Sequence, residues 1–407
     1  MMTGTKVLTF ILAGGKGQRL EPLTLENPKP AVTFGGSYKI VDFTLSNCLN
    51  SEIRNIYVLV QYKSAELIRH LRDGWQMYFS TARGEYLEII PPQYAGTDEA
   101  YMGTANAIYQ NLYLIEQEKP DYVLILAGDH IYKMDYRLML RAHHDNDADL
   151  TVGAVEVPLR DGNQFGIIQA DETNRIVGFQ EKPATPSPIP NNPENCFASM
   201  GIYVFKPQAL AEMLRRDAED PHSNHDFGKN IITQMVPTHR VFTYSFIDEN
   251  RKTTKYWRDV GTLDAYYNAN MDLIGVDPIL NLYDANWPIR SAPIQAPPPK
   301  TVFRDDGRTG IAIDSMLSPG CIVSGGRVIN SILSPRVHVH SWTHVEDSIL
   351  FEGVDIARYA KIRRAIIDEG VRVPAHAEIG YDLERDRRRF SVTEAGIVVV
   401  AKNSRFD

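Results

Sequence analysis

Two hydrophobic periods alternate along the chain between residue 7 and about residue 275. Short apolar runs of the strand type are followed by stretches whose apolar residues recur at the helical spacing. We expect strands at 7–12, 56–62, 122–128, 150–157 and 199–205, and helices at 64–75, 103–120 and 207–216. Strands that alternate with helices predict a mainly parallel, doubly wound sheet with helices on both faces. Such sheets bind ligands beyond the carboxyl ends of their strands.

After about residue 310 the pattern changes to an internal repeat of 17 residues. Aliphatic residues recur at this spacing in three series: Ile322, Val339, Ile356 and Val373; Val328, Val345, Ile362 and Ile379; and Val337, Val354 and Val371. A helix pair would show the 3.6-residue period, and a propeller blade needs about 40 residues. Aliphatic residues about six positions apart, in three sets per repeat, instead predict a three-sided, left-handed parallel β-helix whose aliphatic side chains point inward.

A proline-rich stretch separates the two patterns. Five prolines lie between Trp287 and Lys300, so little of this stretch can be helical. We therefore expect a Rossmann-like domain at 1–280, an extended connector at 281–310 that lies on protein surface, and a β-helix domain at 311–407.

Composition and charge narrow the function classes. The 407 residues are 43% hydrophobic and 23% charged, as in an ordinary globular protein, and the net charge of −8 argues against nucleic acid as a partner. Cys48, Cys196 and Cys321 form no CxxC pair, so neither a disulfide framework nor a zinc site is expected from them. No apolar run approaches the roughly 20 residues of a membrane span, and the apolar start VLTFILAGG is too short for a signal peptide. We expect a cytoplasmic enzyme with no membrane partner.

The first predicted strand ends in a glycine-rich stretch, LAGGKGQRL, which contains Gly14, Gly15, Gly17 and Arg19. Glycines let backbone N–H groups approach an anion, but they also suit a tight structural turn. The stretch matches neither the Walker pattern nor the dinucleotide fingerprint, so both interpretations stay open on these residues alone. Its place at a strand end favours a phosphate loop.

Charged residues elsewhere supply candidate chemistry. Lys29 lies between two prolines on a stiff, extended segment, although a lysine is more often solvated surface. Asp129 directly follows the strand at 122–128, and Asp259 lies in YWRDVGT. Each aspartate suits either a magnesium ion or a turn or helix cap.

Glu181 and Lys182, in FQEKP, end a strand-like run. Neighbours on a strand point to opposite faces, so we do not expect them to bind each other. One is then free to reach a ligand hydroxyl and the other a phosphate.

The predicted site combines the glycine loop with Arg19, Lys29, Lys182, Asp129 and Asp259. Phosphoryl and nucleotidyl transfer need such a site, because they depend mainly on positioning and charge neutralisation.

Longer motifs make the chain similar to a known family. They are LAGGKGQRL, PKPAVTFGG, DFTLSNCLNS, GTANAIYQN, ILAGDHIYKMDY, FQEKP, ASMGIYVF, HDFGK and YWRDVGTLDAYYNAN. Together they resemble the bacterial glucose-1-phosphate adenylyltransferases (ADP-glucose pyrophosphorylases), from about residue 7 to 402. The first motif indicates only the wider sugar-nucleotide pyrophosphorylase group, whereas SNCLNS, HDFGK and YWRDVGT are specific to this branch.

The resemblance implies a nucleotidyltransferase that joins ATP and glucose 1-phosphate, giving ADP-glucose for glycogen or α-glucan synthesis and pyrophosphate. It implies in-line attack on the α-phosphorus without a covalent intermediate. It puts Arg19 and Lys29 on the triphosphate, and Mg²⁺ on Asp129 and Asp259. It puts glucose 1-phosphate against Tyr101, Gly166, Glu181, Lys182 and Ser199. A homotetramer and a phosphorylated metabolite effector are also implied.

The chain departs from the family pattern near the expected regulatory site. Glu26 and Asn27 replace a basic pair that helps bind a sugar-phosphate activator in well-studied members. The basic residues that remain are Lys39, Arg388 and Arg389. We therefore expect a monophosphate effector in place of a bisphosphate. Asn106 replaces the usual aspartate of GTAD, and we derive no consequence from it.

Three alternatives differ in function. A pyrophosphorylase for another nucleotide or sugar would share the loop and both aspartates but lack HDFGK and YWRDVGT. A non-catalytic regulatory subunit would usually have lost Lys29 or Asp129. An acyltransferase fused through the β-helix would need a catalytic histidine in the repeats. The candidates are His338, His340, His344 and His376, which no second motif supports.

Overall fold

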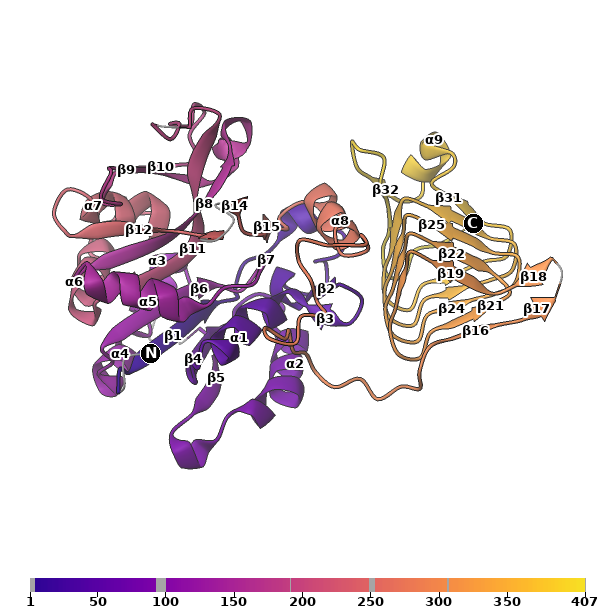
Figure 1. Ribbon diagram of the computed structural model, residues 1–407, viewed down its shortest axis with the longest axis horizontal. Helices are drawn as coiled ribbons and strands as arrows, with labels where there is room; N and C mark the ends of the chain where they lie inside the picture. Colours follow the sequence, from indigo (N-terminus) through magenta and orange to yellow (C-terminus); the bar gives the residue numbers. More distant parts are fainter. Residues whose placement is uncertain (1–3, 93–99, 191, 249–252, 306, 407) are drawn as a thin grey trace.

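The computed structural model describes residues 4–92, 100–190, 192–248, 253–305 and 307–406, and it divides into the two domains shown in Figure 1. The first domain contains a mixed sheet with helices on both faces, and the second is a β-helix. The two predicted fold classes are thereby confirmed.

The sheet of the first domain has nine strands among the described residues. Its main path is β10 (Ile176–Glu181), β9 (Gly166–Ala170), β11 (Asn195–Phe205), β6 (Tyr122–Ala127), β1 (Val7–Leu12), β4 (Asn55–Leu59) and β5 (Tyr86–Ile90), with β8 (Leu150–Pro158) and β12 (Val241–Ser245) off that path. Strands β6, β1, β4 and β5 are parallel, as the alternation predicts. Strand β11 runs antiparallel to β6, β8 and β9, so the sheet is mixed beyond β6.

Two hydrophobic clusters cover the faces of this sheet. One contains buried residues of α1 (Ile40–Asn50), α2 (Ala65–Trp75) and α5 (Tyr136–Asp145). The other contains those of α3 (Thr104–Tyr109), α4 (Leu112–Glu118) and α6 (Pro207–Ala218). The single helix predicted at 103–120 is therefore two helices. They are separated at Asn111, whose buried side chain donates to the Ala107 carbonyl and to the Tyr101 hydroxyl.

Three sheets of parallel coil strands form the second domain. The first sheet is β16 (Lys300–Val302), β21 (Ile322–Ser324), β24 (His338–Val339), β27 (Asp355–Ile356) and β30 (Arg372–Val373). The second is β19 (Ile311–Ile313), β22 (Arg327–Ile329), β25 (His344–Glu346), β28 (Lys361–Arg363) and β31 (Glu378–Ile379). The third is β20 (Met316–Leu317), β23 (Ile332–Leu333), β26 (Ile349–Leu350), β29 (Ala365–Ile367), β33 (Val398–Val400) and β32 (Ser391–Val392), which pairs antiparallel with β33. A short helix, α9 (Leu383–Arg387), precedes β32.

The predicted aliphatic series line the inside of this prism, with one change of register. Val345 and Ile362 are fully buried, as the repeat predicts. Val323, however, pairs with Val339, whereas Ile322 pairs with His338 and is only half-buried. The prediction for Ile322 is wrong because the chain from Val323 to Val339 is one residue shorter than the 17-residue repeat.

One face of the β-helix packs on the first domain. Ile332, Ile349 and Ile366 belong to a shared cluster with Tyr266 and Leu273, beside α8 (Leu263–Met271). Figure 1 shows α8 on the side of the first domain that faces the β-helix. This packing fixes the two domains against each other.

The predicted connector lies against α1. Residues 272–299, all of them described, contain neither helix nor strand. Within this segment Ile289 is buried, and the indole of Trp287 donates to Asn47 at 2.9 Å. The first strand of the β-helix is β16, which lies inside the segment predicted as connector.

Candidate active site

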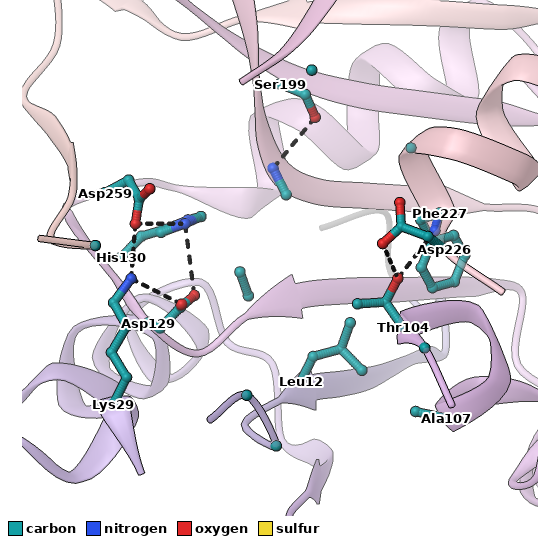
Figure 2. Close-up of a pocket in the computed structure, with 18 of the residues that line it drawn as sticks. Leu12, Lys29, Thr104, Ala107, Asp129, His130, Ser199, Asp226, Phe227 and Asp259 are labelled. Carbon is teal, nitrogen blue, oxygen red and sulfur yellow. Dashed lines mark hydrogen bonds and ion pairs between the residues drawn. The ribbon is translucent and has the colours of Figure 1, made fainter. Parts of the chain in front are cut away.

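A cavity of about 740 Å³ opens beyond the carboxyl ends of β1 and β6, where the sequence predicts ligand binding. Figure 2 shows side chains of several segments pointing into it. The residues predicted to bind substrate or metal all line this cavity: Gly14, Gly15, Gly17, Arg19, Lys29, Tyr101, Asp129, Gly166, Glu181, Lys182, Ser199 and Asp259.

The glycine-rich loop forms one wall. Gly17 has a φ of +64°, and a Cβ there would lie 3.1 Å from the Cβ of Lys29, so this position requires glycine. A Cβ at Gly15 would meet nothing within 4 Å. The amides of Gly14, Gly15, Lys16 and Gly17 donate no hydrogen bond to any other described residue. Free amides in a concave loop suit an anion, so the phosphate-loop interpretation is favoured over the tight turn.

Lys29 bridges the two predicted metal-binding carboxylates. Its Nζ donates to Asp129 Oδ2 at 2.9 Å and to Asp259 Oδ1 at 2.8 Å (Figure 2). Asp129 follows β6, and Asp259 ends β15 (Trp257–Asp259). Strand β15 pairs with β7 (His130–Tyr132), which brings the two aspartates together.

These contacts determine the protonation of Lys29 and Asp129. Burial opposes the charge of Lys29, whose side chain is only 8% exposed, but the two carboxylates outweigh burial and raise its pKa. Burial likewise opposes the charge of Asp129, yet Lys29 and then His130 lower its pKa below the ordinary value. At neutral pH the lysine is therefore protonated and Asp129 ionised.

The same residues fit a divalent cation. Ligand atoms of Asp129, His130 and Asp259 all lie within 4.8 Å of one another. Two carboxylates are the donors that hard cations take from proteins, with phosphate oxygens and water completing the shell. The Lys29 ammonium lies between these carboxylates, which shows that the position is electrostatically suited to a cation.

The other end of the cavity is lined by polar groups around Glu181. Burial and then Asp226 raise the pKa of Glu181. A Cβ on Gly166 or Gly228 would come within 3.0 Å or 2.4 Å of a Glu181 oxygen, so both glycines leave room for this carboxylate. Carboxylates here can accept hydrogen bonds from the hydroxyls of a polyol.

The expectation that Glu181 and Lys182 do not meet is wrong. Lys182 Nζ lies 3.7 Å from Glu181 Oε1. Strand β10 ends at Glu181, and Lys182 has a φ of +46°, so the alternation of a strand no longer applies at Lys182. Its side chain is 60% exposed and therefore free to move to a ligand.

Two further residues at the cavity were not predicted as site residues. His130 Nε2 lies 3.6 Å from Asp129 Oδ1 and 3.9 Å from Asp259 Oδ1, and its ring packs edge-on against Trp257. Asp226 accepts a hydrogen bond from Thr104 at 3.2 Å (Figure 2). His130 lies in the motif GDHIY and Asp226 in HDFGK. Nothing in the sequence indicated that either side chain points into the cavity, because that depends on the fold.

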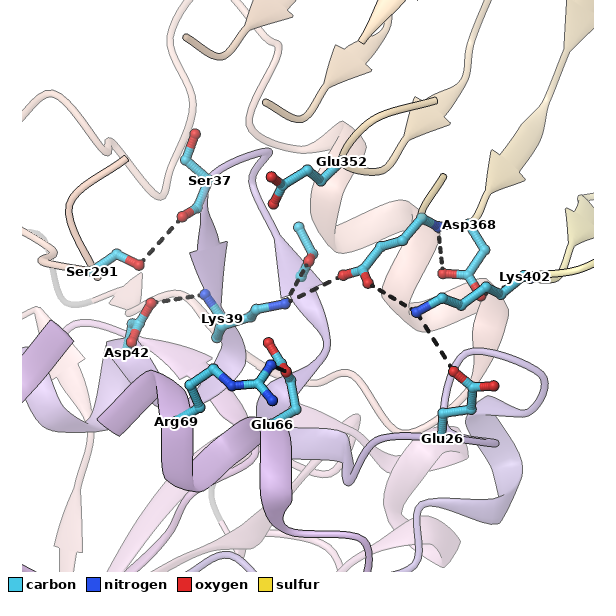
Figure 3. A network of polar contacts seen from close by, with 12 residues as sticks. Glu26, Ser37, Lys39, Asp42, Glu66, Arg69, Ser291, Glu352, Asp368 and Lys402 are labelled. Atoms are coloured by element: carbon cyan, nitrogen blue, oxygen red, sulfur yellow. Dashed lines mark hydrogen bonds and ion pairs between the residues drawn. The ribbon is translucent and has the colours of Figure 1, made fainter. Parts of the chain in front are cut away.

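The predicted regulatory residues are not brought together in this chain. Lys39 Nζ lies at the domain interface, 3.6 Å from Glu369 Oε1 (Figure 3). Arg389 is held within the β-helix domain by the buried Asp386, at 2.8 Å, and Arg388 is exposed. Neither arginine contacts Lys39 in the described part of the chain.

Lys402, and not Arg388 or Arg389, lies near Lys39. It pairs with Glu369 at 3.6 Å and with Glu26 at 3.5 Å, so a chain of alternating charges crosses the domain interface (Figure 3). A second cavity of about 870 Å³, which includes Glu26, Asn27 and Lys402 among its lining residues, opens next to this chain of charges.

Comparisons with known proteins agree with this geometry. Residues 8–275 match the nucleotidyl transferase family, and residues 297–400 match the GlmU-like C-terminal hexapeptide family. A protein of Rhodopirellula baltica named glucose-1-phosphate adenylyltransferase is 54% identical over 98% of this chain and 90% of its own length. Proteins of the same name from Koribacter versatilis and Methylococcus capsulatus are each 51% identical, over 98% and 97% of this chain and 96% and 93% of their own lengths.

None of the helices in the described parts of the chain has the length and apolarity of a membrane span. Identity of about half over nearly the full length of both this chain and its relatives shows that the chain belongs to the glucose-1-phosphate adenylyltransferase family.

Proposed function

We propose that this protein transfers the adenylyl group of ATP to α-D-glucose 1-phosphate and releases pyrophosphate. The ADP-glucose formed is a glucosyl donor for glycogen or another α-glucan. The observation that carries the proposal is the Lys29 bridge between Asp129 and Asp259, beside a loop of free amides. Cations and carboxylates are thereby gathered where a triphosphate and its metal ion have to be held.

At the ATP end, the loop amides of Gly14, Gly15 and Gly17 are positioned to bind phosphate oxygens. Arg19 is 62% exposed, and its Nη2 lies 4.0 Å from Asp259 Oδ2, so it can turn onto the β- and γ-phosphates. Lys29 exchanges its carboxylate partners for phosphate oxygens when the nucleotide binds. Both cations then neutralise charge on the departing pyrophosphate.

Asp129 and Asp259 would hold Mg²⁺, which when bound supplies charge neutralisation at the phosphates. His130 does not suit Mg²⁺ as a ligand, because this ion prefers oxygen donors. We assign His130 to positioning the two aspartates, from its contacts with both.

At the sugar end, Glu181 accepts hydrogen bonds from glucose hydroxyls, and Lys182 binds the phosphate of glucose 1-phosphate. Tyr101, Gly166 and Ser199 line the same space. In the chemical step an oxygen of the sugar phosphate forms a bond to the α-phosphorus of ATP. The bond from that phosphorus to the bridging oxygen breaks, and pyrophosphate leaves with the electron pair. No protein nucleophile takes part.

A pyrophosphate-release assay tests this function. The purified protein is given glucose 1-phosphate with ATP, UTP, GTP or dTTP, with and without Mg²⁺. We expect turnover with ATP that depends on the metal. Faster turnover with another nucleotide would support the alternative pyrophosphorylase, and none with any nucleotide would support the regulatory subunit.

The assembly, location and regulation of the protein are further proposals. A homotetramer is proposed from the family resemblance, and a monomer in sedimentation velocity at micromolar concentration would contradict it. The cytoplasmic location stays a prediction. We also propose a phosphorylated metabolite effector that binds between the two domains, where Lys39 and Lys402 supply positive charge.

A further inference from the structure

Two of the four β-helix histidines, His338 and His340, lie together on the first sheet of this domain. They are two residues apart, on strand β24 and directly after it, so their side chains leave the same face. Their ring centroids are 3.9 Å apart, with an interplanar angle of 31°. Two imidazoles therefore share one patch of surface.

A carboxylate from the next coil completes the group. Asp355, on β27, is the register partner of His338. Its Oδ2 lies 3.7 Å from His338 Nδ1 and 3.3 Å from His340 Nε2. Among the described residues, these two histidines are the ion-pair partners of Asp355.

We propose that His338, His340 and Asp355 form a binding site for a borderline transition-metal ion, Zn²⁺ above all, separate from the active site. Ligands bound to zinc at about 2.0–2.1 Å in a tetrahedron lie about 3.3 Å apart. The two nitrogen–oxygen distances are close to that value without any movement of the backbone. All ligand atoms of the group lie within 4.8 Å of one another.

The chemistry of the donors separates this site from the catalytic one. Two imidazoles and one carboxylate suit Zn²⁺, Ni²⁺ and Cu²⁺, whereas Mg²⁺ prefers oxygen ligands and goes to Asp129 and Asp259. The side chains are 33%, 32% and 41% exposed, so an ion can enter and water can fill the fourth position.

The placement of the site gives the ion a structural effect. Its ligands come from β24 and β27, which are successive coils of one sheet. A bound ion links the two coils and stabilises the folded state, because it binds the native arrangement and not the unfolded chain. The inference does not depend on the proposed function.

The test measures Zn²⁺ binding to the full-length protein after removal of metals with a chelator. Excess Mg²⁺ is present so that the active-site aspartates are occupied. Equilibrium dialysis is expected to find one more Zn²⁺ per chain in the wild type than in the His338→Ala/His340→Ala variant. Asp355→Asn should weaken binding about 10-fold or more. Zn²⁺ should also raise the melting temperature of the wild type but not of the double variant.

A matched control uses His344, a histidine on the neighbouring sheet that is 34% exposed and pairs with Glu346 at 3.5 Å. His344→Ala should bind Zn²⁺ like the wild type. Pyrophosphate release without Zn²⁺ should be normal in all variants, which shows that they fold. Equal Zn²⁺ binding by the wild type and the double variant, or loss of binding in His344→Ala, would overturn the proposal.

Discussion

Lys29 forms ion pairs with two aspartates that lie 100 and 230 residues from it in the sequence. The pKa of Asp129 is lowered by this lysine and by His130, in spite of burial. The stabilisation of the folded state by the Lys29–Asp129 ion pair is therefore fully present above the ordinary aspartate pKa of about 3.9. It is lost as the pH falls through the lowered pKa of Asp129. Lys29 and Asp129 therefore keep their charges throughout the neutral range.

Asp129→Asn is expected to reduce kcat by about 10²–10³-fold or more. One well-placed electrostatic partner is worth that much in rate, and the change also weakens the proposed metal site. Pyrophosphate release under saturating substrates measures the effect, with circular dichroism as the check on folding. Near-normal turnover by a folded variant would exclude the role assigned to Asp129.

Lys29→Met is expected to increase the affinity of the nucleotide-free protein for a divalent cation. The lysine ammonium and the ion compete for the same two carboxylates, and removal of the lysine takes away the cation nearest to both of them. Mn²⁺ binding, followed by electron paramagnetic resonance, measures the change, and kcat should fall in the same variant. Lys133→Met removes a lysine that pairs with a single carboxylate, Asp284, and should leave Mn²⁺ binding unchanged. Weaker Mn²⁺ binding by Lys29→Met would contradict the competition.

Lys182→Ala is expected to raise KM for glucose 1-phosphate and to leave KM for ATP almost unchanged. Lys182 lies at the Glu181 end of the cavity, away from the glycine loop, and binds ground state and transition state alike. Lys182→Arg should also be impaired, because a planar guanidinium does not replace a compact ammonium. Steady-state kinetics with each substrate varied in turn measures both KM values. A change in KM for ATP alone would show that Lys182 binds ATP and not glucose 1-phosphate.

At the scale of elements, the β-helix derives its stability from its inward rows. Val323, Val339, Ile356 and Val373 follow one another in register, each at most 1% exposed. The repeat in the sequence identified this row except at its first member, because one coil is a residue short. A shift of one residue moves a side chain to the other face of a strand, so only the pairing of the coils distinguishes Ile322 from Val323.

Ile356→Ala is therefore expected to destabilise the protein by about 2–5 kcal/mol, because it leaves a cavity in a closely packed row. The matched variant Ile322→Ala removes the same atoms from an outward, half-buried position and should cost clearly less. Urea unfolding of the full-length variants compares the two. Equal losses would contradict the observed register.

At the scale of the whole molecule, the two domains meet through an apolar face and through alternating charges. Ile332, Ile349 and Ile366 pack beside α8, while Glu26 and Glu369 alternate with Lys39 and Lys402 across the interface. An anion that binds there competes with Glu26 and Glu369 for the same lysines. Each exposed ion pair contributes about 1 kcal/mol or less. The interface therefore offers too few cations to bind a bisphosphate tightly.

A monophosphate effector is accordingly expected to activate better than fructose 1,6-bisphosphate. Glu26→Lys should strengthen the response to the bisphosphate, because it adds a cation and releases Lys402 from its pair. Activation curves with fructose 6-phosphate, 3-phosphoglycerate, pyruvate and the bisphosphate measure the response. If the effector instead binds at Arg388 and Arg389, charge reversal at either arginine should abolish activation while basal activity persists.

Charge-reversal variants can distinguish two locations for the effector, the domain interface and the region of α9. Arg389 is bound to Asp386 inside the β-helix domain, whereas Lys402 faces the catalytic domain. Loss of activation in Lys402→Glu with normal activation in Arg388→Glu would locate the effector at the domain interface of a single chain. The reverse result would locate it at α9, where a second subunit would have to supply the remaining contacts.

The sequence by itself determined the features that depend on local periodicity. Neighbouring residues encode the alternating strands and helices, the coil repeat and the glycine loop, so these features were predictable. The position of the motif residues at strand ends was predictable for the same reason. Tertiary structure alone decided which side chains meet. The pairing of β7 with β15 puts Asp259 beside Asp129, and the end of β10 lets Lys182 reach Glu181. The first contact joins residues far apart in the chain, and the second depends on the residue at which a strand ends. The local pattern of hydrophobic and polar positions specifies neither of them.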